Sequence, residues 1–149
     1  MPRCVGERVE LRLTFHGAAA AATGPDSIHV LDDGKVRVVG AAGGRVHHAH
    51  AGTEGTLITS GGVRFAIEGE APADRVCCTG ELWEDRHGYP AGVTEGRLAD
   101  IWWRPAVLRR VGDVGLAIDG YGPGEQLGST DDWPRGHRSW ALQLTVWVP

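Results

Sequence analysis

Apolar and polar residues alternate with a period of two along much of the chain. The apolar positions are Val9, Leu11, Leu13 and Phe15 near the start, and Trp140, Leu142, Leu144, Val146 and Val148 near the end. Successive side chains of a strand point to opposite faces, so this alternation predicts strands that each bury one face. Shorter stretches at 76–83, 97–103 and 116–118 predict further strands.

Turn-forming residues separate these stretches. Asp32-Asp33-Gly34 follows the run 27–31, and Ser60-Gly61-Gly62 follows the run 56–59. Glycine supplies the positive φ that tight turns need, so both places predict hairpins. Pro105 has no backbone N–H to donate, so we expect the strand at 97–103 to end before it. The alanine tract Ala18–Ala22 predicts a short helical turn or a loose connection, and residues 121–138 predict a long loop.

The resulting pattern of about eight to ten short strands, without a clear amphipathic helix, predicts an all-β fold. The chain has 23 glycines among 149 residues, roughly twice the average share. Glycine weakens helices and suits tight turns, which favours the same fold class. A chain of this length suits one hydrophobic core. We therefore expect residues 1–149 to form a single small β-barrel domain.

Charge and composition narrow the classes of partner. The net charge is −4 and the longest basic run is Arg109-Arg110, which disfavours a nucleic-acid-binding surface. No apolar run approaches the ~18 residues of a membrane span. The start, MPRCVGERVELRLTF, carries charges where a signal peptide would be apolar. The three cysteines, Cys4, Cys77 and Cys78, do not suggest a secreted disulfide framework. We expect a cytoplasmic protein that does not contact a membrane.

Three potential metal ligands cluster in one short segment. His48 and His50 are two residues apart, Glu54 follows after three residues, and Gly61 follows after six more. Residues two apart on a strand project from one side, so both imidazoles can bind one ion together with a nearby carboxylate. Such a ligand set suits Fe, Mn, Ni or Zn. The segment is therefore a candidate metal site.

This spacing resembles the first half of the cupin motif, in which His-x-His is followed by a Glu and a Gly. The resemblance implies a metal held within a β-barrel and an enzyme acting on a small organic substrate. The second half of the motif is a Pro-x-Gly turn followed by a fourth ligand, a His. Here Pro90-x-Gly92 has no His after it. His87, just before the turn, is the candidate fourth ligand or proton shuttle.

A second resemblance covers Glu68–Ile101. This run is similar to the middle of uncharacterised small β-rich proteins of high-GC bacteria and of oligomer-binding β-barrels. It carries a Val-x-x-x-Gly-x-Leu strand that starts at Val76 and leads into a charged loop. The resemblance implies the fold class and no activity.

Six tryptophans in so small a chain suggest an interaction surface. Trp102 and Trp103 are adjacent, so they point to opposite faces of their strand and at least one leaves the core unless both faces are covered. Trp133 lies in the long loop near the end of the chain. We expect at least one of Trp102, Trp103 and Trp133 to be partly exposed and to line a ligand pocket or a dimer interface.

The same long loop carries groups capable of acid–base chemistry. Asp131, Asp132 and His137 lie close together in sequence, and with His87 they are the candidate catalytic residues. The sequence leaves two function classes open. One is a binding module that recognises a small apolar or aromatic ligand, or a protein partner, through a tryptophan-lined surface. The other is a metal-dependent, cupin-like enzyme. Either class is compatible with a homo-oligomer.

Overall fold

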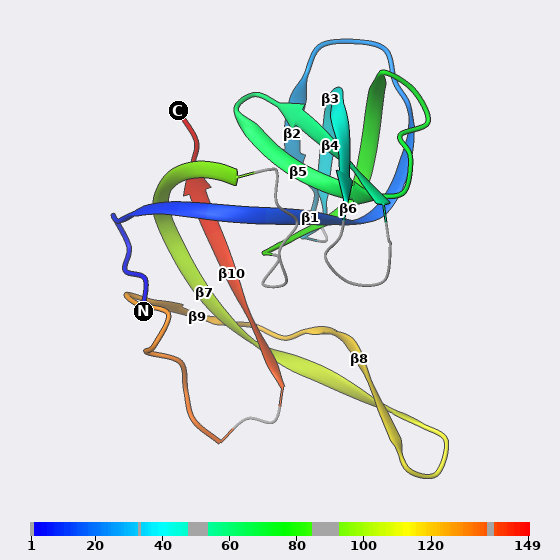
Figure 1. The fold of residues 1–149 in the computed structure, drawn as a ribbon. Helices are drawn as coiled ribbons and strands as arrows, with labels where there is room; N and C mark the ends of the chain where they lie inside the picture. Colours follow the sequence, from blue (N-terminus) through cyan, green and yellow to red (C-terminus); the bar gives the residue numbers. More distant parts are fainter. Residues whose placement is uncertain (1, 33, 48–53, 85–92, 137–138) are drawn as a thin grey trace. The chain divides into compact units, whose positions relative to one another are not determined.

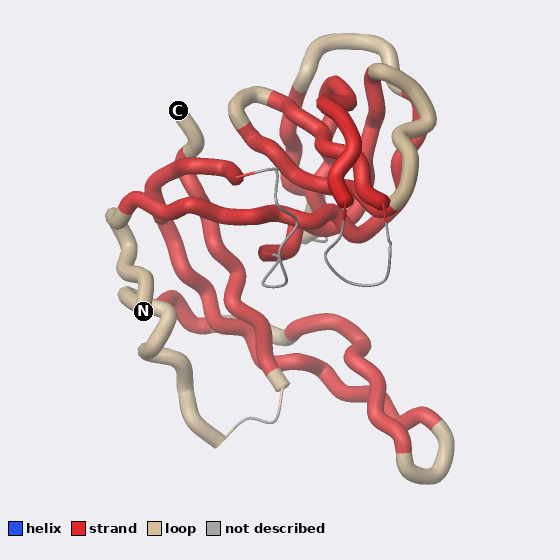
Figure 2. The backbone as a smooth tube through the Cα atoms, in the orientation of Figure 1, coloured by secondary structure: helices blue, strands red, loops and turns tan. Residues whose placement is uncertain are grey.

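The structure is a computed structural model that describes residues 2–32, 34–47, 54–84, 93–136 and 139–149. Figure 2 shows that the described chain consists of strands joined by loops and turns, without a helix. Among the described residues there is accordingly no helix long and apolar enough to cross a membrane. The strands are β1 (Arg8–Ala21), β2 (Ser27–Val30), β3 (Val36–His47), β4 (Glu54–Ser60), β5 (Val63–Glu68), β6 (Arg75–Glu84), β7 (Val93–Val111), β8 (Gly115–Tyr121), β9 (Glu125–Leu127) and β10 (Trp140–Trp147).

The chain divides into two compact units. The barrel unit contains Glu10–Glu95 with Val148–Pro149, and the sheet unit contains Met1–Val9 with Gly96–Trp147. Strands β1 and β7 each contribute residues to both units. The expectation of one domain over residues 1–149 stays a prediction.

Five strands close the barrel in the ring order β1–β6–β3–β4–β5–β1 (Figure 1). Four of the contacts are antiparallel, and the fifth is a single parallel pairing of Thr14 with Ala66 between β1 and β5. Strand β2 pairs with β3 as the predicted hairpin. The predicted all-β small barrel is therefore confirmed.

Side chains from alternate positions of these strands fill the barrel. Its core contains Phe15, Val38, Ile58, Val63, Phe65, Ile67, Val76 and Cys78. The Phe15 and Phe65 rings pack 5.5 Å apart between centroids, within the range of favourable aromatic pairs. The period-two pattern at the start of the chain thus gives the expected buried face.

The predicted turn between β4 and β5 forms as glycine chemistry requires. Gly61 and Gly62 have φ values of 53° and 82° between β4 and β5. Positive φ at both central residues is typical of the type I′ hairpin turn, whose twist matches the flanking strands.

The alanine tract is a strand, which corrects the expectation of a helical turn or loose connection. Ala18 and Ala21 pair with Thr79 and Val76 of β6. A few alanines cannot form a stable helix alone, whereas the edge of β6 satisfies their backbone hydrogen bonds. The tertiary contact therefore decides the conformation.

The backbones of β1 and β6 approach very closely where Gly17 faces Gly80. A Cβ atom added at Gly80 would lie 2.1 Å from the His16 carbonyl oxygen and 2.7 Å from the Gly17 Cα. Only glycine fits without moving the backbone. This pair of glycines sets how tightly the barrel closes.

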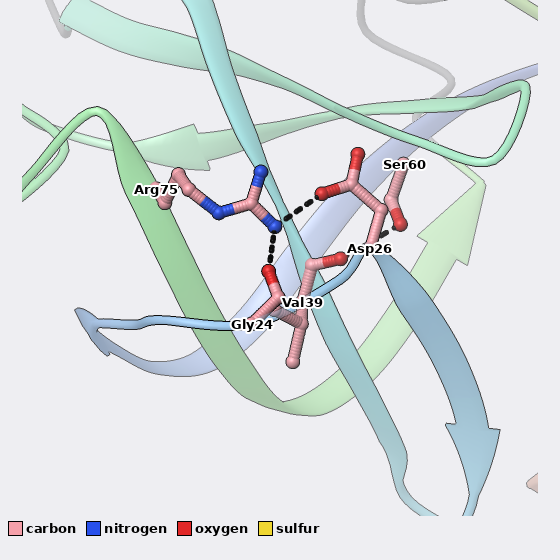
Figure 3. Close-up of polar contacts among 5 residues, drawn as sticks. All are labelled: Gly24, Asp26, Val39, Ser60 and Arg75. Atoms are coloured by element: carbon pink, nitrogen blue, oxygen red, sulfur yellow. Dashed lines mark hydrogen bonds and ion pairs between the residues drawn. The ribbon is translucent and has the colours of Figure 1, made fainter.

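Arg75, at the start of β6, fixes the connection between β1 and β2 (Figure 3). Its guanidinium donates to the Gly24 carbonyl and pairs with the Asp26 carboxylate, at 2.6 Å in the ion pair. Nearby, the buried Ser60 hydroxyl donates to the Val39 carbonyl at 2.9 Å. The contacts of Arg75 and the contact of Ser60 all join segments that are distant in sequence.

Strand β7 runs through Pro105, so the expected stop before it is wrong. Pro105 lies opposite Trp140 of β10, and its carbonyl accepts from the Gly122 N–H at 2.8 Å. On that edge of β7 the pairing changes from β9, at residues 101–103, to β8, from residue 106 onward. The missing N–H of proline falls at this change of partner, where little ladder bonding is lost.

We predict that Gly80→Ala destabilises the protein by about 1–3 kcal/mol, the usual range for overpacking a tight site. The matched control is Gly128→Ala, because a Cβ there meets only the Asp132 carboxylate oxygen, at 3.7 Å. Denaturant unfolding followed by circular dichroism measures both variants. Equal stability of Gly80→Ala and the parent would contradict the close approach.

Candidate functional site

The sheet unit contains a three-stranded antiparallel sheet in the order β9–β7–β10. Trp102 of β7 lies between Gln126 of β9 and Gln143 of β10, and Ile101 lies between Leu127 and Leu144. Residues directly opposite each other on neighbouring strands share a face. The register therefore assigns every side chain of this sheet to one of two faces.

One face is apolar and packed. Ile101, Trp103 and Leu127 are buried on it, and Trp103 is only 4% exposed. Leu142 and Leu144 of β10 lie on the same face and are half-buried. The alternation predicted for β10 is confirmed, although its apolar residues are only partly covered. Trp103 is a core residue here.

The opposite face centres on Trp102, which is half-buried. Asp100 and Arg104 flank it along β7 at two-residue spacing. The Gln126 side-chain amide donates to the Asp100 carboxylate at 2.7 Å, and the Arg104 Nε donates to the Gln143 side-chain oxygen at 2.8 Å. We name Asp100, Trp102, Arg104, Gln126 and Gln143 the Trp102 face. It combines one aromatic ring with four hydrogen-bonding side chains.

Trp133 contributes to a different cluster. Its ring stacks on Trp140 with 4.8 Å between centroids, and the Arg135 guanidinium lies 5.7 Å from the Trp133 centroid. Trp140 faces Pro105 and alternates in phase with Leu142, so it shares the face of Trp103. The structure thus separates Trp102 from the other two predicted tryptophans. Trp102 and Trp133 are both half-buried, which agrees with the expected partial exposure. That one of the three tryptophans lines a ligand pocket or a dimer interface stays a prediction.

The barrel unit carries an aromatic cluster that the sequence analysis did not single out. Trp83 is 43% exposed, its Nε1 donates to the Glu81 carboxylate at 3.0 Å, and its ring meets His16 edge-on at 6.3 Å. The pairing of β1 with β6 brings these three residues together, because Glu81 lies opposite His16 and Trp83 lies opposite Thr14. Pairing between distant strands leaves no local sequence signal.

An open cavity of about 400 Å³ lies beside β1 and β5 in the barrel unit. The two strands share one pairing, Thr14 with Ala66. The cavity is lined by Phe15, His16, Gly17, Ala19, Ile67, Glu68, Glu70 and Pro72. Imidazole and carboxylate groups line it, although none of these residues was a sequence candidate.

The predicted acid–base residues are only partly described. Asp131 and Asp132 are exposed in a turn, where the Asp132 N–H donates to the Ser129 carbonyl at 3.2 Å. His87 and His137 lie outside the described residues. A catalytic role for the four residues stays a prediction.

The metal hypothesis also falls largely outside the described residues. His48, His50 and His87 are not among them, and Glu54 is the first residue of β4, paired with His47 of β3. In the ranges that the structure describes, no group of three or more histidine, cysteine or acidic side chains could hold a metal ion. The His48, His50, Glu54 and His87 site therefore stays a prediction, as does the resemblance to cupins.

Cys77 and Cys78 differ sharply in environment. Cys78 is buried in the barrel core, whereas Cys77 is half-buried and accepts a hydrogen bond from the Arg37 Nε at 3.4 Å. Burial raises the pKa of the Cys78 thiol to about 11, and the neighbouring Cys77 adds to the rise. Cys78 is thus an unreactive core residue, since the thiolate is the nucleophilic form.

Comparisons with protein-family models, with curated proteins and with solved structures found no match to this chain.

The raised pKa of Cys78 predicts a loss of stability at high pH. The folded state holds the thiol proton more tightly than the unfolded state, so the stabilisation is complete below pH 9 and is lost as the pH rises toward 11. Between pH 9 and 10 the free energy of unfolding should fall by about 1 kcal/mol more in the parent than in Cys78→Ala. Denaturant titrations at both pH values measure this, with Cys4→Ala as the control for the loss of a thiol outside the core. Identical slopes in the parent and Cys78→Ala would contradict the assignment.

Proposed function

We propose that this protein is a non-enzymatic binding module that recognises an aromatic or apolar group through the Trp102 face. The group belongs either to a small ligand or to a side chain of a partner protein. One observation carries this function: Trp103 is buried in the sheet core, while Trp102 is half-buried on the opposite face among polar side chains. A tryptophan side chain that does not fill the core is typical of residues that recognise a ligand or partner.

The chemistry of the Trp102 face supports recognition of a ring with polar substituents. The indole offers a flat apolar surface for stacking. The amides of Gln126 and Gln143 can both donate and accept hydrogen bonds, whereas Arg104 only donates and the Asp100 carboxylate only accepts. These side chains are already held in pairs by hydrogen bonds of 2.7 and 2.8 Å. Such preorganisation lowers the entropy that binding must overcome.

We place this function in the cytoplasm. Support comes from the composition: the three cysteines include an adjacent pair, Cys77-Cys78, and free thiols persist in a reducing compartment.

Single alanine variants test the assignment of the two tryptophans. Trp103→Ala should destabilise the protein by about 3–5 kcal/mol, because it empties a core site. Trp102→Ala should lose much less stability, because its ring is only half-buried. Thermal unfolding followed by circular dichroism measures both.

Binding is tested on the same variants with N-acetyltyrosinamide and N-acetyltryptophanamide as probes. We expect the probes to shift the Trp102 indole N–H resonance of the parent, and binding to be lost in Trp102→Ala. The matched control is Trp83→Ala, because Trp83 is 43% exposed and lies in the barrel unit, outside the sheet that carries the Trp102 face. Equal probe binding by the parent and Trp102→Ala would overturn the proposed function.

A further inference from the structure

Beyond Pro105, strand β7 leaves the three-stranded sheet and forms a two-stranded hairpin with β8 (Figure 1). Leu108 pairs with Ile118, and Val111 pairs with Gly115 next to the turn. We call residues 106–121 the arm. In the described part of the chain, β8 pairs only with β7, and β10 ends its pairing with β7 at Pro105. Apart from the Ala106 N–H, which donates to the Ser139 carbonyl at 3.1 Å, neither edge of the arm pairs with another strand among the described residues.

The arm concentrates exposed apolar side chains. Those of large size are Val107, Leu108, Val111, Val114, Leu116, Ile118 and Tyr121, with exposures between 36% and 100%. Scattered exposed apolar residues are normal, but a contiguous group marks an interaction surface. An isolated two-stranded hairpin is also only marginally stable in water. The arm thus has the properties of a segment that another surface covers.

The two faces of the arm differ in chemistry. Leu108 and Ile118 share one face, which continues with Leu116 and the stem of Arg110. On the opposite face Arg109 pairs with Ala117 in register, and its guanidinium lies 3.4 Å from the Asp119 carboxylate. The centre of the first face, formed by Leu108, Leu116 and Ile118, contains no charge. We name these three residues the apolar arm face.

Charge favours a second copy of this chain as the occupant. The arm carries Arg109, Arg110, Asp113 and Asp119, so its formal charge cancels, while the whole protein carries −4. Two copies repel each other over most of their surface, and a locally neutral region is where they approach at least electrostatic cost. The Arg110 guanidinium donates to the Asp113 carbonyl at 3.3 Å, which holds this cation near the turn.

We propose that two copies of the chain associate through their arms, with the apolar arm face of one packed on the same face of the other. A two-fold axis makes such an interface self-complementary. Two twisted ribbons packed face to face bury their inner side chains in a layer about 10 Å thick. The ion pair of Arg109 with Asp119 then faces solvent.

Sedimentation velocity of the intact protein over a concentration series tests this interface. The parent should show a reversible monomer–dimer equilibrium. Ile118→Glu places a carboxylate in the centre of the apolar arm face and should weaken dimerisation at least about tenfold. Val111→Glu is the matched control, because Val111 is 47% exposed against 51% for Ile118 but points to the opposite face. Both variants should keep the parental circular dichroism spectrum, since both sites are exposed.

Leu116→Glu provides a second variant on the same face and should behave like Ile118→Glu. A parent that stays monomeric at every concentration overturns the proposal. So does a result in which Ile118→Glu and Val111→Glu weaken dimerisation equally. Flotation with vesicles of phosphatidylcholine and phosphatidylserine tests the competing occupant, a membrane. Binding of monomeric parent to these vesicles, lost in Ile118→Glu, would also overturn it. We expect no flotation, because Asp113 lies beside Val114 at the tip of the arm.

Discussion

The barrel depends on the close approach of β1 and β6 at Gly17 and Gly80. Strand β1 is the element that closes the ring, because it pairs with β6 along most of its length and meets β5 at Thr14 alone. Any side chain at Gly80 would press on the His16 carbonyl and hold these strands apart. The long β1–β6 ladder therefore holds the barrel closed. The short β1–β5 contact leaves room for the cavity beside these two strands.

The sheet unit depends in a similar way on one strand that serves several partners. Strand β7 pairs with β10 and β9 in its middle and with β8 beyond Pro105. Proline is tolerated at the change of partner, where its missing N–H disrupts little of the ladder. This arrangement gives the same strand a packed section, with Trp103 in its core, and an exposed section in the arm. The residues of β7 that stabilise the sheet and those proposed to contact a partner therefore lie in different sections of the same strand.

Within the packed section, the pleat of the strand places core residues and exposed residues on opposite faces. Adjacent residues face opposite ways, so Trp103 stabilises the sheet while Trp102 stands among Gln126 and Gln143 on the other side. A substitution at Trp102 is therefore less constrained by folding than one at Trp103. The two proposed surfaces, the Trp102 face and the apolar arm face, use different residues of β7 and can be altered independently.

The sequence by itself determined the fold class, most strands and the sidedness of the Trp102-Trp103 pair, because period-two alternation and glycine turns are local properties. It also indicated Trp102 as a candidate for exposure. Tertiary structure alone decided that the alanine tract extends β1, that β7 passes through Pro105, and that Trp133 stacks on Trp140 rather than joining Trp102. For the arm, the sequence predicted only a short strand at 116–118. Each of these outcomes depends on which strand supplies the neighbouring hydrogen bonds or covers a given face. Such pairing joins residues far apart in the chain, and local patterns of residues do not encode it.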